Sequence, residues 1–446
     1  MSSEGGASDH MTKHTPQATL LSILFMGLGQ WYNRQFVKGM LFALVEIGGI
    51  YWIVTRLATS VKGLITLGDT PRGMVKIGKE FKPVEGDHSI FMMVEGLIAL
   101  IFVLLLLFVY FLCVRDARLT ALNREKGIEP PSFKISWSNM ANRNFPYFIL
   151  AIPIMAAVLF TVMPIVFTVL VAFTDFAAPN LPPAKLVNWV GFDVFNNLVN
   201  LGSWSKTLIG VAVWTVFWSV AATLTTYMLG TIVAVLIHQK GIRLKTFWRT
   251  ILVIPFAVPN LVSLLVFRNL LNEQFGPINQ YLELLGLSGI PWLNDPTWAR
   301  ITVIAVNLWL GFPLIMILVS GILTTISKDL YEAAEVDGAS RFFIFRVITF
   351  PLVLFSTAPI LITQFASNFN NFNVIFLLTN GNPVMPDYIY AGGTDLLVTW
   401  LYKLTLTNNQ YNFASVLSIL VFIFIASISI INYRKTQSFK EEDLIQ

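Results

Sequence analysis

The most informative polar segment of this chain reads Tyr331-Glu332-Ala333-Ala334-Glu335-Val336-Asp337-Gly338-Ala339-Ser340-Arg341, and it separates two apolar segments of membrane length. Its alanines predict a short helix that is thin enough to enter a cleft, and Gly338 predicts a turn that a side chain would obstruct. Its carboxylates supply charge that a basic rim of a partner protein can hold: Glu332, Glu335 and Asp337. For the Glu-Ala-Ala motif taken alone, an ordinary amphipathic connecting helix is the alternative.

The composition places the chain in lipid. Apolar residues make up 55% of the sequence and charged residues 12%, whereas a soluble domain carries about 25% charged residues. Such a chain would expose large apolar patches in water. The net charge of +5 indicates basic cytoplasmic loops rather than nucleic-acid binding. The single Cys113 excludes an internal disulfide framework, and the four scattered histidines suggest no metal site.

Long charge-poor runs recur along the chain, and a spanning helix needs about 20 apolar residues. We therefore predict an all-α integral membrane protein with about eight transmembrane helices. The predicted spans lie near residues 38–55, 90–113, 146–174, 207–237, 248–270, 299–323, 346–376 and 411–432. The apolar run 18–30 is too short to cross and is predicted to be interfacial or re-entrant. Residues 1–11 read like a tag remnant followed by a second start codon, and we leave them out of the fold prediction.

The charged loops predict how the spans are oriented. If segment 331–341 faces the cytoplasm, alternation places loops 114–145 and 238–247 inside, and both carry several Lys and Arg residues. Loop 271–298 falls outside and has no Lys or Arg, as the positive-inside rule expects. Loop 56–89 disagrees, because it should lie outside and yet carries Arg56, Lys62, Arg72, Lys76, Lys79 and Lys82. The majority of the loops predicts cytoplasmic termini.

Two carboxylates, Glu46 and Glu95, fall inside predicted spans. An intramembrane carboxylate is a functional candidate by default. The alternative is that each one faces protein or lies near a membrane interface, and the absence of a basic residue at matching depth favours this alternative.

The span after the polar segment carries amide side chains on one predicted helix face. Gln364, Asn368 and Asn371 follow i, i+4, i+7 spacing. An aromatic stripe with similar spacing runs beside them: Phe365, Phe369, Phe372 and Phe376. Amides suit neutral, hydroxyl-rich ligands, and aromatic faces suit the apolar faces of sugar rings. Equally, the asparagines can join helices to one another while the phenylalanines face lipid or core.

The spacing of the polar segment resembles the ATPase-docking loop of bacterial ATP-binding-cassette (ABC) importers. Gly338 follows the last alanine of Glu-Ala-Ala by four residues, and nine more residues lead to Ile348-x-x-Pro351. Phe350 stands where that signature usually has leucine. The resemblance implies a docking loop at 328–351. The residues it implies for ATPase docking are Glu332, Ala333, Ala334, Asp337, Gly338 and Ala339.

Further segments closely resemble the larger membrane subunit of maltose/maltodextrin importers. They are Ile254–Pro259, Phe275–Asn279, Asn307–Pro313, Phe365–Phe372 with Leu377–Pro383, and Gly393–Val398. The resemblance covers residue 207 to the C-terminus and implies a type I ABC importer permease fold. It implies sugar contacts at Phe256, Asn307, Leu310, Gly311, Leu314, Gln364, Asn368 and Asn371.

Three of these positions depart from the family's well-known member. Phe256 and Leu314 stand where that member has tyrosines, and Gln364 stands where it has serine. The loss of two phenol hydroxyls and the larger amide change the polar groups of the predicted pocket. They leave the sugar class in place and put the identity of the sugar in doubt.

The predicted organisation also departs from the well-known member, which carries a large folded outer insert. Here the connection 175–206 is too short for a core of its own. The N-terminal half resembles versions of this subunit from Gram-positive bacteria. The predicted regions are 12–145 (N-terminal membrane region), 146–206 (third span and short extracellular loop), 207–435 (permease core) and 436–446 (cytoplasmic tail).

Together these features predict a permease subunit of an ATP-driven oligosaccharide importer in the bacterial cytoplasmic membrane, with maltodextrin-like sugars or galacto-oligosaccharides as substrate. The expected partners are a second permease subunit, two ATPase subunits and an extracellular sugar-binding protein. The sequence contains no Gly-x-x-x-x-Gly-Lys-Ser/Thr motif, so ATP and Mg²⁺ are expected on the partner ATPases and no cofactor on this chain.

Two other function classes compete. A self-contained secondary transporter would show internal repeats and a coupling carboxylate at mid-membrane, and we find no clear repeat. A membrane enzyme acting on polysaccharide would need paired carboxylates, and the predicted ligand face offers amides instead.

Overall fold

The computed structural model describes residues 14–77, 80–142, 145–239 and 241–435. The chain forms two compact units, unit 1 (Met1–Gly191) and unit 2 (Phe192–Gln446). The predicted tag remnant at 1–11 and cytoplasmic tail at 436–446 lie outside the described residues. The predicted boundaries at 145 and 206 stay predictions.

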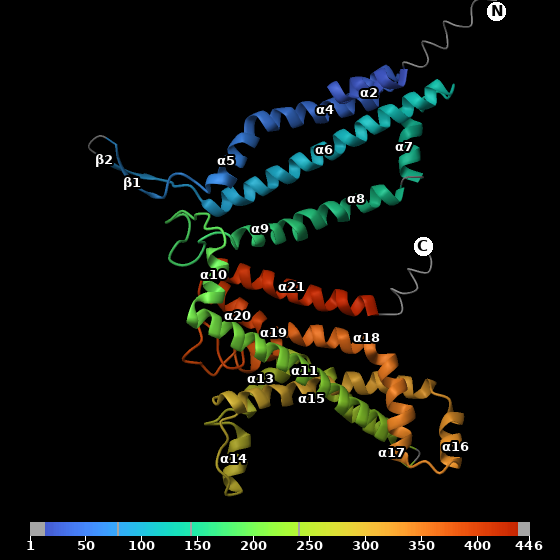
Figure 1. The fold of residues 1–446 in the computed structure, drawn as a ribbon, viewed down its shortest axis with the longest axis vertical. Coiled ribbons are helices and arrows are strands. Elements are labelled where there is room, and N and C mark those ends of the chain that lie inside the picture. The colour runs from blue at the N-terminus through green and yellow to red at the C-terminus, as the bar shows by residue number, and fades with distance from the viewer. Residues whose placement is uncertain (1–13, 78–79, 143–144, 240, 436–446) are drawn as a thin grey trace, which may run out of the picture. The chain divides into compact units, whose positions relative to one another are not determined.

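Unit 1 consists of long apolar helices and one small sheet (Figure 1). Its elements are α2 (His14–Leu24), α3 (Leu28–Tyr32), α4 (Phe36–Trp52), the π-helical turn η1 (Ile53–Leu57), α5 (Ala58–Thr66), β1 (Gly73–Ile77), β2 (Glu80–Val84), α6 (Ser89–Glu125), α7 (Phe133–Asn142), α8 (Phe145–Ala157), η2 (Val158–Val162) and α9 (Met163–Val171).

Buried amides join the short helix α3 to α6. Gln30 Nε2 donates to the Cys113 carbonyl oxygen and Asn33 Nδ2 to the Ala117 carbonyl oxygen, each at 2.8 Å. The chain enters α3 through Gly27 at φ +97°, where an added Cβ would lie 2.1 Å from the Gly39 carbonyl oxygen. Only glycine allows α3 and α4 to approach this closely. The run 18–30 is therefore two short helices rather than one span.

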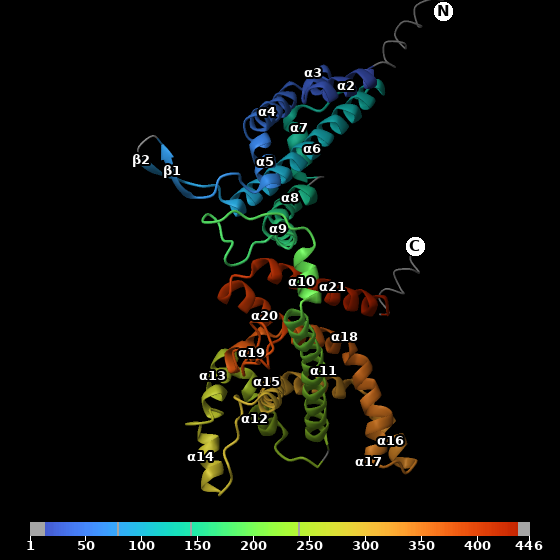
Figure 2. The same ribbon diagram turned by 60° about the vertical axis from the view of Figure 1, so that its left-hand side comes forward.

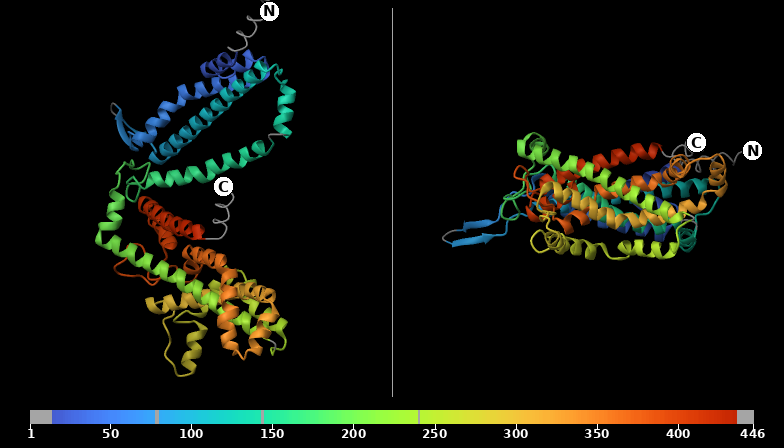
Figure 3. Two further views of the ribbon diagram at one scale, coloured as in Figure 1. Left: turned by 45° about the vertical axis from the view of Figure 1, so that its right-hand side comes forward. Right: turned by 90° about the horizontal axis from the view of Figure 1, so that it is seen from below.

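Strands β1 and β2 form an antiparallel hairpin, with Gly73 opposite Val84 and Ile77 opposite Glu80. It projects from the helices of unit 1 (Figure 3). The prediction of an all-α membrane protein is confirmed for a chain that is mostly helical, and this short hairpin is an element that the prediction did not include. In β1, Val75 and Ile77 alternate with Lys76, a strand pattern that the search for long apolar runs does not detect.

Unit 2 carries the remaining elements (Figure 2). They are α10 (Asp193–Asn200), α11 (Gly202–His238), α12 (Lys245–Ala257), α13 (Asn260–Leu270), α14 (Pro277–Leu284), α15 (Pro296–Thr325), α16 (Lys328–Val336), α17 (Arg341–Ile344), η3 (Phe345–Thr349), α18 (Phe350–Phe369), α19 (Phe372–Leu378), α20 (Leu397–Tyr402), η4 (Lys403–Thr407) and α21 (Tyr411–Lys435).

The core of unit 2 forms where α11 crosses α15. Trp218 and Val303 are fully buried in one apolar cluster, together with Leu378 and Leu396 from the C-terminal part. A second cluster contains Tyr227 of α11 and Ile315 of α15. Glycines on both helices bring the backbones together, as is typical of helix pairs in membranes.

Within the described residues, six helices are long and apolar enough to cross a membrane, and a seventh span results if the bent pair α12 and α13 counts as one. The shorter apolar stretch Tyr411–Ser427 lies in the eighth predicted segment. Each of the eight predicted segments is formed mostly by helices, and eight as the number of spans stays a prediction.

The predicted span 248–270 is a broken helix rather than a single straight one. Helices α12 and α13 meet at an angle of 88°. Pro259 lacks a backbone N–H and disfavours helical backbone at the residue before it. Val258 is accordingly extended, at φ −85° and ψ 133°. Of the two prolines in Ile254–Pro259, Pro255 lies inside α12 and Pro259 lies at the bend.

Two predicted loops are also shorter than expected. Helix α5 continues to Thr66, so Arg56 and Lys62 of the discordant loop lie on helical segments. Helix α6 continues to Glu125, so Arg115, Arg118 and Arg124 lie on a helix as well. Long basic side chains at the end of a span can reach the membrane surface with their charged groups. A helix can therefore continue beyond its apolar run.

The structure gives different surroundings to the two intramembrane carboxylates. The Glu46 carboxylate accepts a hydrogen bond from the Met26 backbone N–H, so it faces protein. The Glu95 side chain is exposed on the surface of the chain. For Glu46, a structural role is therefore the simpler account.

The α11–α15 crossing yields the first prediction. An added Cβ at Gly230 would lie 2.6 Å from Ile315 Cβ and 2.8 Å from the Phe312 carbonyl oxygen. We expect Gly230→Ala to destabilise the chain by about 1–3 kcal/mol, the usual range for overpacking. Thermal unfolding of the purified chain in mild detergent measures the change.

Gly321→Ala is the matched control, because Gly321 lies on α15 with no atom within 4 Å of an added Cβ. We expect the control to unfold at or slightly above the temperature of the unmodified chain. Equal destabilisation by both substitutions would contradict the close crossing.

Candidate functional site

Helix α16 is an exposed helix between α15 and α17 (Figure 1). It begins at Ser327, whose side chain accepts a hydrogen bond from the Asp329 N–H at 3.3 Å. A side-chain acceptor at this position satisfies one of the free N–H groups of the first turn. None of its residues is buried. The sequence therefore forms a stable local helix whose surface remains open to a partner.

Backbone hydrogen bonds close the C-terminal end of α16. The Ala339 N–H donates to the Ala334 carbonyl oxygen at 3.0 Å, and the Gly338 N–H donates to that of Glu335 at 3.1 Å. This pair of bonds is the Schellman motif, which requires a left-handed residue. Gly338 supplies it at φ +75°.

The expected reason for Gly338 needs correction. An added Cβ at Gly338 would meet no atom within 4 Å, so a side chain would not obstruct the turn. The requirement is the left-handed backbone, which L-residues other than Asn and Asp adopt with difficulty.

Apolar side chains are exposed around this turn. Val336 is 86% exposed and Phe342 is 72% exposed. Beside them lie the carboxylates Glu332, Glu335 and Asp337, all exposed. A small apolar surface edged by acidic groups suits a partner cleft with an apolar floor and a basic rim.

The turn is connected to the helix that follows it. The Ser340 side chain caps α17 by accepting from the Phe343 N–H at 3.3 Å. The hydroxyls of Tyr331 on α16 and Thr349 on η3 lie 3.3 Å apart. Helix α16 is thus linked to the base of α18 through a hydrogen bond as well as through the chain.

The amide face predicted downstream is not one helix face. Helix α18 ends at Phe369, and Asn371 starts α19 by accepting from the Val374 N–H at 3.2 Å. Gln364 and Asn368 lie on α18, whereas Asn371 lies at the break. The i, i+4, i+7 prediction fails here because an asparagine side chain competes for the backbone and favours helix starts over helix interiors.

The structure gives partners to the asparagines. Asn368 is 4% exposed, and its Nδ2 donates to Thr223 Oγ1 on α11 at 2.9 Å. The backbone carbonyl oxygen of Asn368 accepts from Trp218 Nε1 at 3.0 Å. Asn371 Nδ2 donates to Asn307 Oδ1 on α15 at 3.4 Å. The asparagines join α18 to α11 and the start of α19 to α15, which is the structural alternative stated for them.

The aromatic stripe is divided at the same break. Phe369 is buried and stacks on Phe424 of α21, with ring centroids 5.2 Å apart. Phe372 and Phe376 stack at 4.8 Å and both contact Tyr402. The hollow beside Phe369 has a volume of about 20 Å³, which is too small for a sugar ring. These rings pack mainly against protein.

The remaining positions of the predicted sugar site differ in exposure. Phe256 is 52% exposed and Leu314 is 46% exposed, while Leu310 is buried. Gly311 lies at the helix crossing, where an added Cβ would be 2.8 Å from Thr226 Cγ2. Gln364 is half-buried. The exposed positions are open to a ligand or to a partner, and the assignment of sugar contacts stays a prediction.

A buried ionic cluster in the Gly393–Val398 segment was not identified from the sequence. Asp395 accepts from Lys403 Nζ at 2.6 Å, from Thr399 Oγ1 at 2.8 Å and from the Gly392 N–H at 2.6 Å. Burial raises the pKa of Asp395, and the Lys403 ammonium opposes that rise. Asp395 and Lys403 lie eight positions apart in the sequence, but the sequence does not reveal their burial. That burial depends on α11, where Trp214 Nε1 donates to the Thr394 carbonyl oxygen at 3.1 Å.

The asparagine contact yields the second prediction. We expect Asn368→Leu to destabilise the chain by about 1–3 kcal/mol, because it leaves the buried Thr223 hydroxyl without this partner. Adding Thr223→Val should recover part of the loss, since both polar groups are then absent. A double-mutant cycle of thermal unfolding measures the coupling. Additive effects would show that the bond is not structural.

The sequence of this chain matches a known family model and is similar to known transport proteins. Residues 226–435 match the family model "Binding-protein-dependent transport system inner membrane component". The chain is similar to the galactooligosaccharides transport system permease protein GanP of Bacillus subtilis, with 40% identity over 96% of this chain and 100% of the relative. It is also similar to the maltodextrin transport system permease protein MdxF of the same organism, with 36% identity over 98% of this chain and 99% of the relative.

Two further similarities are more limited. The maltose/maltodextrin transport system permease protein MalF of Escherichia coli is 39% identical over 52% of this chain and 46% of the relative. A solved bacterial ABC transporter involved in alginate import aligns with a TM-score of 0.54 and 22% identity, over 68% of this chain and 99% of that chain. This structural similarity supports the fold alone.

Proposed function

This chain belongs to the permeases of binding-protein-dependent ABC importers, and we propose that it forms the sugar path of an oligosaccharide importer together with a second permease subunit. The observation that carries the proposal is the exposed helix α16, with its glycine-closed turn, between two long apolar helices. A membrane subunit of this kind is a transport component rather than an enzyme.

We place the ATPase on α16. The docking residues Glu332, Ala333, Ala334, Asp337, Gly338 and Ala339 lie on this helix and its closing turn. The alanines keep the helix thin, Val336 offers apolar area, and the carboxylates offer charge to a basic rim. Two ATPase subunits, one here and one on the second permease, would supply ATP and Mg²⁺, because this sequence has no phosphate-binding loop.

The link from α16 to α18 supplies the mechanism. When the ATPases close, a rigid α16 moves with them, and the Tyr331–Thr349 contact together with the capped α17 transmits the motion to η3 and α18. The attached spans then switch between inward-facing and outward-facing arrangements, which is a rigid-body two-state change. For this coupling to work, the closed ATPases have to bind one of the two arrangements more strongly than the other.

The predicted sugar contacts carry no charge. Phe256, Leu310, Gly311 and Leu314 are apolar, and Asn307, Gln364, Asn368 and Asn371 are amides. Such a set suits neutral oligosaccharides rather than acidic ones. We propose maltodextrin-like sugars as substrate. Galacto-oligosaccharides are the second candidate, because the relative named for that transport shares 40% identity over its whole length.

Delivery and location complete the proposal. An extracellular sugar-binding protein would bring the substrate to the outer mouth. The positive-inside pattern supports a multi-pass protein of the bacterial cytoplasmic membrane with both termini in the cytoplasm.

The docking turn yields the third prediction. We expect Gly338→Val to lower ATP-driven uptake at least tenfold in reconstituted vesicles and to reduce co-purification of the ATPase, because a β-branched residue resists φ +75°. Asp337→Lys should act in the same direction through charge reversal. Uptake of labelled sugar and the amount of ATPase recovered are the two measurements.

Gly286→Val is the matched control. Gly286 also has φ +77° with no atom within 4 Å of an added Cβ, and it lies in the loop that follows α14. It carries the same backbone strain away from α16. We expect ATPase recovery to be normal with this variant. Normal ATPase recovery and normal uptake with Gly338→Val would exclude the docking role.

The exposed apolar positions yield the fourth prediction. Phe256→Tyr with Leu314→Tyr should shift the preference among oligosaccharides, because a hydroxyl discriminates ligands more sharply than apolar bulk does. Both positions are about half exposed, so a longer side chain fits without repacking a core. We expect a relative gain for maltose-like sugars. The measurement is an uptake profile over maltodextrins and galacto-oligosaccharides, and an unchanged profile at equal expression would remove these positions from the sugar site.

A further inference from the structure

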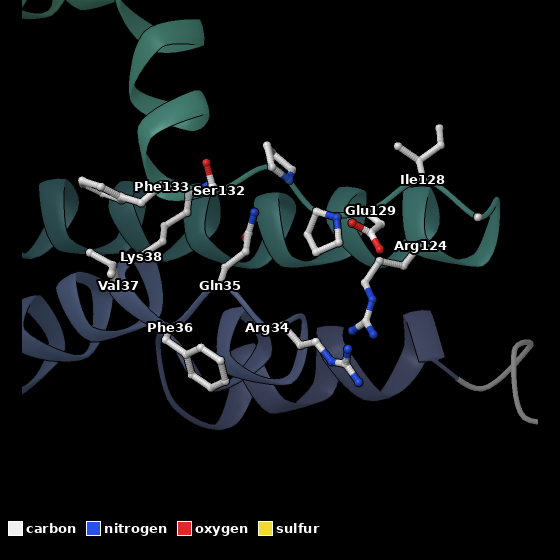
Figure 4. A pocket seen from close by; sticks show the side chains of 13 residues that line it. Arg34, Gln35, Phe36, Val37, Lys38, Arg124, Ile128, Glu129, Ser132 and Phe133 are labelled. Carbon is white, nitrogen blue, oxygen red and sulfur yellow. The ribbon is translucent and has the colours of Figure 1, made fainter.

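Unit 1 contains a cavity of about 560 Å³ that the transport proposal does not use. It lies between the start of α4, the end of α6 and the segment that leads to α7 (Figure 4). The lining residues that matter here are Arg34, Gln35, Lys38, Arg124, Glu129 and Phe133.

The lining is positively charged, with three cationic side chains against the carboxylate of Glu129. Lys38 is partly neutralised by Asp116, with Nζ 2.5 Å from Oδ1. Arg124 Nη1 donates to the Tyr32 carbonyl oxygen at 3.0 Å, which fixes the guanidinium and leaves other N–H groups for a ligand. Arg34 is exposed at the rim.

His14 lies beside Arg124 and adds no positive charge. Its Nε2 is 3.0 Å from Arg124 Nη1. Burial is the main cause that lowers the pKa of His14 below its ordinary value, and the Arg124 guanidinium is the second. The imidazole is therefore neutral at pH 7, and the arginines determine the charge of the cavity.

The N-terminus of α4 also faces this cavity, through Gln35, Phe36 and Val37. Helix N-termini attract anions because their first N–H groups lack partners within the helix and carry the positive end of the helix dipole. The residue preceding α4, Gln35, has no side-chain capping bond.

Gln35 provides an independent sign of a ligand. It is 8% exposed, and its Oε1 has no hydrogen-bond partner among the described residues. A buried amide oxygen without a donor destabilises the chain. Figure 4 shows its side chain directed into the space between the flanking elements. A ligand donor would satisfy it once the terminal amide turns about its last torsion, because Oε1 itself is closed off while Gln35 lines the cavity.

The cavity lies where two candidate membrane spans end. The first span starts at Phe36 and the second ends at Glu125. Phe36, Val37 and Met40 are exposed apolar residues on the first turns of α4. Charged groups are therefore at the level of lipid head groups, with an apolar face next to them for acyl chains.

We propose that this cavity binds the head group of an anionic phospholipid of the phosphatidylglycerol class. The phosphate would lie against Arg34, Arg124 and the N-terminus of α4, and a glycerol hydroxyl would donate to Gln35 Oε1. The acyl chains would lie along Phe36 and Met40. This site is independent of sugar transport and of the docking of the ATPase.

The test uses the full chain in phosphatidylcholine bilayer discs with and without phosphatidylglycerol. Native mass spectrometry counts retained lipid, and thermal unfolding measures stabilisation. We expect phosphatidylglycerol to be retained preferentially, and Arg34→Gln to weaken its retention about tenfold, as the loss of one charge-assisted hydrogen bond implies. Arg34 is exposed, so this variant leaves the packing intact.

Arg118→Gln is the matched control, because Arg118 is an exposed arginine on α6 that does not line the cavity. We expect its retention of phosphatidylglycerol to be that of the unmodified chain. Equal losses for Arg34→Gln and Arg118→Gln would indicate general charge attraction and overturn the site.

Two further experiments distinguish which part of the lipid the cavity recognises. Gln35→Leu should reduce the preference for phosphatidylglycerol over phosphatidic acid, which lacks the glycerol hydroxyls. Inorganic phosphate should not reproduce the stabilisation, because it has no acyl chains for the apolar face. Equal stabilisation by inorganic phosphate, or unchanged phosphatidylglycerol retention with Arg34→Gln, would overturn the proposal.

Discussion

Where α11 crosses α15, glycines hold the two backbones so near that an added Cβ at Gly230 or Gly311 would lie 2.6–2.8 Å from atoms of the opposite helix. In a bilayer the lipid tails are as apolar as the side chains, so close packing and hydrogen bonds have to hold helices together. This crossing places Thr223 and Trp218 where α18 can bond to them. The position of α18, and hence of the docking turn before it, depends on that contact.

The docking turn and the transmembrane core are connected by short polar links. Tyr331 and Thr349 join α16 to the base of α18, and Asn368 joins α18 to α11. In the proposed mechanism, a push on α16 would reach a helix that is bonded within the core rather than a flexible loop. Asn368, one of the amides of the proposed sugar site, also maintains this connection, so its first role is structural.

Unit 1 shows the same principle at the membrane surface. Buried amides fix α3 against α6, and the basic residues at the ends of α4 and α6 gather around one cavity. Exposed apolar residues lie beside it on the first turns of α4. Basic groups next to apolar surface at a span end are the arrangement that anionic head groups favour.

The sequence alone determined the apolar segments, their helical form, and the Ala-Gly pattern of the docking turn, because these depend on composition and on residues within a few positions of each other. It also pointed to the permease family through local motifs. Only the tertiary structure decided that the 346–376 span breaks before Asn371, that α12 and α13 bend by 88°, and that Asn368 is buried against Thr223. The partners of an amide lie far away in the chain, 145 positions in the case of Asn368 and Thr223. Whether such a side chain meets a ligand or another helix depends on which element packs beside it, and that is a property of the fold rather than of the local sequence.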